Sequence, residues 1–177
     1  PRKSLKGQSV QDALLTPTRI YVKQVRAALA AHPGAVHALA HITGGGITEN
    51  LNRALPATLD ARVEVGTWNM EPIIPFVCKA AKLDETEALK TFNMGLGMVL
   101  IVDPVQAPAV QEALEAMGET VWRVGTVVPG TGSVTYVNES ALFPELESDD
   151  DVPERTPAPG AAERTAERDV FYEEDED

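Results

Sequence analysis

The sequence predicts a mixed α/β (α+β) domain in which helices pack on a mixed β-sheet of four to five strands. Segments with helical spacing of apolar residues alternate along the chain with short segments of strand pattern. The 177 residues, 44% of them apolar, are enough to bury one core. The last two strand segments flank Pro129-Gly130-Thr131-Gly132, which predicts a β-hairpin and hence antiparallel pairing in the sheet.

Apolar spacing and end signals predict the helices. Pro17 ends the first helix, because the residue before a proline avoids the helical region, and Pro56 ends the third. Asp84 is a predicted N-cap, and Gly118 closes the last helix. The expected helical segments are 8–15, 23–31, 47–55, 72–82, 85–90 and a last one that begins near 107.

Five segments have strand patterns. In the first, His37, Leu39 and His41 fall on one face and smaller apolar residues on the other. Residues 98–102 are apolar throughout, which is typical of a central strand buried on both faces. The expected strands are 36–42, 61–65, 98–102, 121–128 and 133–137.

The net charge of −12 is unevenly distributed. Residues 145–177 contain 14 acidic and 3 basic residues, whereas residues 1–144 are nearly neutral. We therefore predict a folded domain over 1–144 and an acidic disordered tail over 145–177, which lacks the apolar surface to offset its ordering entropy. Such a tail is a solvated segment, or it docks on a partner through Val170, Phe171 and Tyr172.

Composition excludes several classes of protein. No apolar run approaches the ~20 residues that cross a bilayer, and no basic patch indicates nucleic acid. The single cysteine, Cys78, indicates a reducing compartment, and its apolar helical context predicts packing and not reactivity. No group of His, Cys and Asp has metal-ligand spacing. We expect a cytoplasmic protein with no metal ligands in this chain and no membrane or nucleic-acid partner.

The strongest candidate site is the glycine-rich turn 44–46, which follows a strand and leads directly into a helix. Glycine N–H groups can converge on a ligand, and the helix start adds partial positive charge. The spacing matches neither a P-loop nor a dinucleotide fingerprint, and a tight turn without a ligand is the alternative. His41 precedes the turn, where it donates to an anion, shuttles a proton, or serves as a core histidine bonded to a carbonyl.

Two further segments carry polar side chains beside glycine or proline. In residues 91–98 (TFNMGLGM), Asn93 precedes two glycines that line a ligand or mark a bulge in a packed strand. In residues 14–21 (LLTPTRIY), Arg19 follows Pro17 and can hold a phosphate or carboxylate with two parallel hydrogen bonds. The alternative for this segment is a linker with one surface arginine.

The segments LLTPTRIYV, AHITGGGITENLNRALP and TFNMGLGM, in this order, resemble the C-terminal domain of the phosphoribosylformylglycinamidine cyclo-ligase (AIR synthetase) family over about residues 4–140. The resemblance implies an ATP-dependent ring closure in de novo purine biosynthesis. In that reaction the substrate's formyl oxygen is phosphorylated, the neighbouring amidine nitrogen attacks that carbon, and phosphate leaves to give aminoimidazole ribotide. The resemblance also implies a homodimer with Mg²⁺ and an active site between the N- and C-terminal domains.

The resemblance assigns roles to residues of this chain. Residues 44–46 match the family's glycine-rich loop, which suits the substrate phosphate or the transferred phosphoryl group, and His41 is the candidate catalytic residue. The candidates for substrate and phosphate binding are Thr18, Arg19, Thr43, Gly44, Gly45, Gly46 and Asn93.

The family's ATP-binding N-terminal domain, with its acidic Mg²⁺ ligands, is missing from these 177 residues. The resemblance therefore implies that ATP and Mg²⁺ are held mainly by that domain, in cis or in trans, and that this half alone has no turnover. The start at Pro1 fits an excised domain or one subunit of a split ligase. A non-catalytic binding or regulatory module of the same fold is the alternative, and the intact motifs favour the ligase half.

Overall fold

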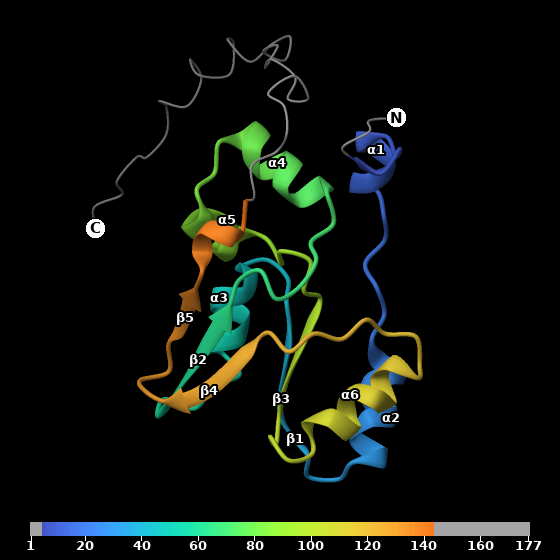
Figure 1. The fold of residues 1–177 in the computed structure, drawn as a ribbon, viewed down its shortest axis with the longest axis vertical. Helices are drawn as coiled ribbons and strands as arrows, with labels where there is room; N and C mark the ends of the chain where they lie inside the picture. The colour runs from blue at the N-terminus through green and yellow to red at the C-terminus, as the bar shows by residue number, and fades with distance from the viewer. Residues whose placement is uncertain (1–4, 144–177) are drawn as a thin grey trace, which may run out of the picture.

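The computed structural model describes residues 5–143, and the predicted mixed α/β architecture is confirmed there (Figure 1). Helices and strands alternate along the chain. The helices are α1 (Val10–Leu14), α2 (Val22–Ala31), α3 (Gly46–Asn52), α4 (Ile73–Ala81), α5 (Glu85–Thr91) and α6 (Ala107–Glu115). The strands are β1 (Val36–His41), β2 (Leu59–Glu64), β3 (Met98–Val102), β4 (Gly125–Pro129) and β5 (Val134–Val137). The predicted tail, 145–177, lies outside the described residues.

Local signals place most element boundaries where the sequence predicts them. The carboxylate of Asp84 accepts a hydrogen bond from the Glu87 N–H at 2.8 Å, which confirms the predicted N-cap of α5. Pro108 lies in the first turn of α6, where the missing N–H costs little. On β1 the faces alternate as expected, with His37, Leu39 and His41 exposed.

The five strands form two small sheets and not one. β1 pairs antiparallel with β3, and β2 is the central strand of a second sheet of order β4-β2-β5. β2 is antiparallel to β4 and parallel to β5, so the predicted hairpin between the last two strands is wrong. The carboxylate of Asp60 explains the difference, because it accepts hydrogen bonds at 2.7 Å from the N–H groups of Thr131 and Ser133. These bonds hold the connection across the end of β2, so that β4 and β5 lie on opposite sides of it.

The prediction that 98–102 is a central strand is wrong in its pairing, since among the described residues β3 pairs only with β1. The predicted burial on both faces is also only partial, since all five residues of β3 are half-buried. Val99 and Ile101 pack on the main core, while Leu100 and Val102 pack on a second cluster formed by α2 and α6. The continuous apolar run therefore reflects cover on two faces and not two hydrogen-bonded neighbours.

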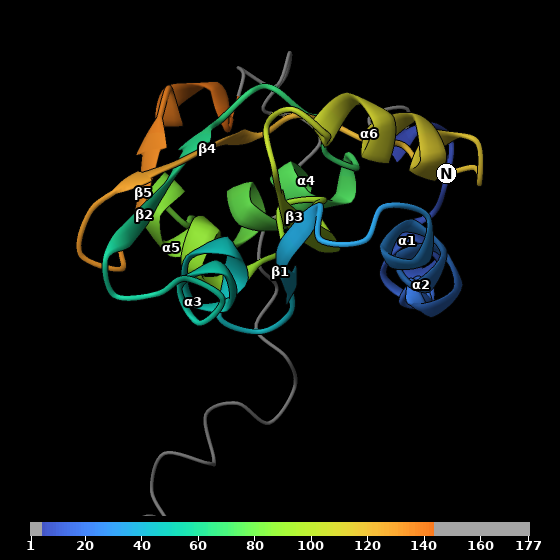
Figure 2. The same ribbon diagram turned by 90° about the horizontal axis from the view of Figure 1, so that it is seen from below.

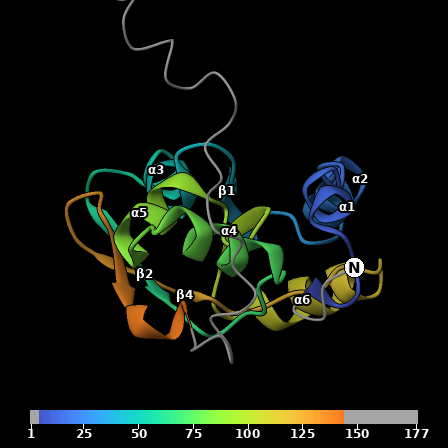
Figure 3. The same cartoon turned by 90° about the horizontal axis from the view of Figure 1, so that it is seen from above.

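Two apolar cores flank the β1–β3 sheet. The main core lies around α3, α5 and the β4-β2-β5 sheet and contains the fully buried Ile47, Leu89, Met94 and Leu142. The second core joins Ala28 of α2 to Val110 and Leu114 of α6. Figures 2 and 3 show α1, α2 and α6 on one side of β1 and β3, and the three-stranded sheet on the other. The β1–β3 sheet thus connects the two halves of the domain.

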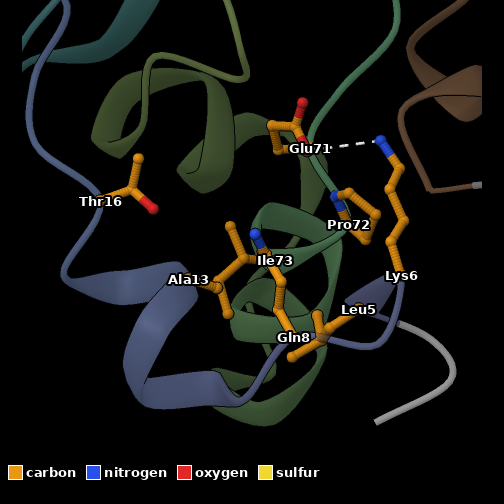
Figure 4. A pocket seen from close by; sticks show the side chains of 8 residues that line it. All are labelled: Leu5, Lys6, Gln8, Ala13, Thr16, Glu71, Pro72 and Ile73. Carbon is orange, nitrogen blue, oxygen red and sulfur yellow. Dashed lines mark hydrogen bonds and ion pairs between the residues drawn. The ribbon is translucent and has the colours of Figure 1, made fainter. Parts of the chain in front are cut away.

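A shallow groove of about 320 Å³ lies between α1 and α4 (Figure 4). Leu5 and Ala13 line it from the N-terminal side, and Pro72 and Ile73 from α4 and its start. An exposed ion pair between Lys6 and Glu71, 3.4 Å apart, closes one end. No helix in the 5–143 range has the length and apolar character to span a bilayer.

Candidate functional site

The glycine-rich loop lies between the end of β1 and the start of α3. Gly46 has φ +60°, and a Cβ there would collide with the backbone carbonyl of Leu89 on α5, so only glycine fits. Gly44 is exposed, and a Cβ there would meet open space. Within residues 5–143 the N–H groups of Gly44 and Gly45 donate no hydrogen bond, so both are available to an acceptor outside the chain.

The loop takes its shape from Asn50, a residue that sequence reasoning missed. Its side chain is only 6% exposed, and its amide nitrogen donates to the carbonyls of Gly46 at 2.8 Å, Gly44 at 3.1 Å and Thr43 at 3.3 Å. The guanidinium of Arg53 donates in turn to the amide oxygen of Asn50. Because these carbonyls turn toward Asn50, the loop presents its N–H groups outward. The sequence signal that could have identified this residue is an asparagine at the fourth position after the glycines.

Glu49 is a second residue that the sequence did not single out. Its carboxylate folds back over the loop, 2.5 Å from where a Cβ on Gly45 would lie. A carboxylate here repels anions and accepts hydrogen bonds from N–H donors. An anion would therefore meet the loop at Gly44, away from this side chain.

The three motifs singled out in the sequence converge at Tyr21. Its phenol group occupies the space that a side chain at residue 97 would need, so glycine is required there. Its ring also lies edge-on to the imidazole of His41, with centroids 6.0 Å apart and an interplanar angle of 70°. The Ile42 N–H donates to the Gly97 carbonyl at 3.0 Å and joins the end of β1 to the same place. Burial raises the pKa of the Tyr21 phenol, so it remains protonated at neutral pH.

Arg19 lies in the same segment but faces α6. Its guanidinium pairs with the carboxylate of Glu119 at 3.2 Å and donates to the Gly118 carbonyl at 3.3 Å. The Arg19 side chain is 53% exposed, which leaves part of its donor surface open to a ligand. Thr18 is exposed. These two candidates therefore lie close to Tyr21 in the chain, and within residues 5–143 neither forms a hydrogen bond or ion pair with the glycine loop.

Asn93 has a local structural role. Its amide oxygen accepts the Gly95 N–H at 3.1 Å in a turn where Met94 has φ +50° and Gly95 has φ +90°. Met94 is fully buried, and its carbonyl accepts the indole N–H of Trp68 at 2.8 Å. The packing interpretation of this motif accounts for these contacts, and a ligand role for Asn93 stays a prediction.

Behind α3 a hydroxyl pair joins the loop helix to the second sheet. Thr48 and Tyr136 on β5 form a hydrogen bond of 2.7 Å, beside a hollow of about 190 Å³. Burial raises the pKa of Tyr136 to about 12. This pair stabilises the position of α3 and therefore that of the glycine loop.

The described residues provide no group of three His, Cys, Asp or Glu side chains able to hold a metal ion. Cys78 is buried, as predicted, and burial raises the pKa of its thiol. A buried thiol with a raised pKa is a poor nucleophile at neutral pH.

Comparison with solved structures first identifies the class of fold. A fold of this kind occurs in the crystal structure of E. coli HypE, with a TM-score of 0.54 and 22% sequence identity. The match covers 85% of this chain and 46% of HypE, and at this identity it shows the fold alone.

Sequence similarity then defines the family. Residues 1–138 match the family model of the AIR synthase related protein, C-terminal domain. A phosphoribosylformylglycinamidine cyclo-ligase of Bordetella petrii is 46% identical over 128 residues, and one of Xanthomonas oryzae pv. oryzae is 42% identical over 126 residues. The matches cover 72% and 71% of this chain and 37% of each relative. The chain belongs to the AIR synthase related proteins, through their C-terminal domain, as the three motifs predict.

Proposed function

We propose that this chain is the substrate-binding C-terminal half of an ATP-dependent phosphoribosylformylglycinamidine cyclo-ligase. One observation carries the proposal most directly. Motifs that are far apart in sequence meet at Tyr21, which contacts both His41 and Gly97 beside the glycine loop. Their convergence supports a shared binding surface, and the named relatives indicate which reaction it serves.

In this proposal the glycine loop binds an anionic group of the substrate. The outward N–H group of Gly44 donates to a phosphate oxygen, and Thr43 contributes a hydroxyl at the exposed start of the loop. Glu49 accepts hydrogen bonds from ligand N–H groups, such as those of an amidine. His41 is exposed beside the loop and is the candidate for proton transfer.

In this proposal ATP and Mg²⁺ bind to a domain of the relatives that lies outside the region matched here, which is 37% of their length. The described residues do not fit a Mg²⁺ ion, since they hold no cluster of three suitable ligands. They do fit phosphate oxygens, through the free loop N–H groups. We accordingly expect a cytoplasmic enzyme that is a homodimer when both domains are present, and no turnover by this chain alone.

Ring closure tests the proposal when measured as ATP-dependent formation of aminoimidazole ribotide. The chain is assayed alone and in a chimaera where it replaces the matching part of the Bordetella petrii ligase. We expect activity only in the chimaera, and its loss in His41→Ala. His37→Ala is the matched control, because His37 is exposed on the same face of β1.

A folded but inactive chimaera would refute the ligase assignment. It would favour the alternative, a non-catalytic module that keeps the fold and the binding loop.

A further inference from the structure

The segment from Leu14 to Val22, which we call the 14–22 segment, exposes an unusual amount of apolar surface. Leu14, Leu15, Ile20 and Val22 are 59 to 77% exposed. Single exposed apolar residues are ordinary, and Val105 at 85% is one here. Four within nine residues concentrate exposed apolar side chains in one stretch of the chain, and concentrations of exposed apolar surface are typical of sites that contact other proteins.

The middle of the 14–22 segment also has free backbone groups, whereas at its ends the Leu15 N–H donates to the Gln11 carbonyl and the Tyr21 carbonyl accepts the Val25 N–H. Pro17 keeps the chain extended, and within the described part of the chain the N–H and C=O groups of residues 16–20 make no hydrogen bond. Figure 1 shows this stretch joining α1 to α2 along one side of the molecule. An extended segment with free backbone groups and apolar side chains is suited to pairing with another chain segment.

Side-chain contacts nevertheless hold the segment in place. The Thr16 hydroxyl donates to the Asp12 carbonyl at 3.1 Å, Arg19 is paired with Glu119, and Tyr21 lies against Gly97. A segment fixed at its start, middle and end loses little entropy when a partner binds. It is therefore a preorganised surface and not a loose linker.

We propose that the 14–22 segment is the docking surface for the ATP-binding domain of the ligase. The partner's identity rests on the proposed function, while the surface rests on exposure and free backbone groups. The relatives are much longer than the matched region, which covers 37% of their length. A further domain of the relatives is therefore available to cover the exposed apolar residues of the 14–22 segment. Thr18 and Arg19 lie among the apolar residues, so docking here places these two candidate residues at the interface between the two domains.

Hydrogen–deuterium exchange tests the inference with the Bordetella petrii chimaera described above and the 177-residue chain alone. Docking is expected to slow exchange of the amides in residues 15–22 by about tenfold or more in the chimaera. The peptide around Val105 is the internal control and is expected to exchange equally in both proteins. Ile20→Asp in the chimaera is expected to restore fast exchange and lower ring closure by about tenfold, whereas Val105→Asp changes neither.

Each outcome decides the inference separately from the proposed function. Protection of residues 15–22 in an inactive chimaera supports the docking surface and refutes the ligase assignment. An active chimaera in which these amides stay unprotected overturns the docking surface and leaves the ligase assignment standing. Protection that already appears in the chain alone and increases with its concentration would identify a second copy as the occupant, and would also overturn the inference.

Discussion

The hydroxyl of Tyr21 lies directly over the α-carbon of Gly97, in space that any other residue at position 97 would fill. This contact joins the 14–22 segment to the turn before β3. The ring contact between Tyr21 and His41 joins the same segment to the end of β1. Position 97 therefore controls where the 14–22 segment lies relative to the candidate site.

Gly97→Ala tests this contact. The added methyl group displaces Tyr21, and overpacking of this kind costs roughly 1–3 kcal/mol of unfolding free energy. Urea unfolding measures the loss, and the NMR signals of the His41 ring report the displacement. Gly44→Ala is the control, since its Cβ meets open space and its φ is not positive. Equal stability of the two variants would contradict the assigned role of Tyr21.

Asn50→Ala is expected to disorder the glycine loop. It leaves the carbonyls of Thr43, Gly44 and Gly46 without their side-chain donor, at a cost of about 1–3 kcal/mol. Exchange of the loop amides and thermal unfolding measure the effect. Asn52→Ala, at the exposed end of the same helix, is the matched control. Unchanged loop exchange in Asn50→Ala would show that the backbone alone fixes the loop.

Asp60 should make stability depend on pH in the acid range. The N–H groups of Ser133 and Thr131 hold the pKa of Asp60 below its ordinary value of 3.8. A lowered folded-state pKa contributes stability that is fully present above the ordinary value and is lost as pH falls through the folded-state pKa. Asp60→Ala is expected to be less stable than the parent at neutral pH, with a difference that shrinks below about pH 4. A difference that is constant with pH would contradict this account.

Tyr136 should make stability depend on pH in the alkaline range, because its pKa is raised whereas that of Asp60 is lowered. Its folded-state pKa of about 12 exceeds the ordinary value of 10.0, so its contribution is present below pH 10.0 and lost as pH rises toward 12. Tyr136→Phe is expected to flatten the loss of stability between these values. It also removes the bond to Thr48, so the variant is expected to be slightly less stable at neutral pH. Spectrophotometric titration of tyrosinate checks the pKa directly, and an ordinary pKa would refute the burial argument.

Local chemistry made much of this fold predictable. The cap at Asp84, the proline in the first turn of α6 and the alternating faces of β1 depend on residues a few positions apart. The class of fold and the family follow from such signals and from three short motifs. The candidate residues were also found as sequence features, but their geometry was not.

The tertiary structure decided what depends on distant residues. Asp60 binds backbone groups more than 70 positions away and thereby pairs β5 with β2 and not with β4. The turn residues between β4 and β5 carry no information about this long-range pairing. Asn50 turns the loop carbonyls inward, and Tyr21 joins segments separated by 76 residues of chain. The sequence determined the elements and the family because propensities and motifs are short-range. The shape of the site was decided by side chains that complete hydrogen bonds and packing only once the chain has folded.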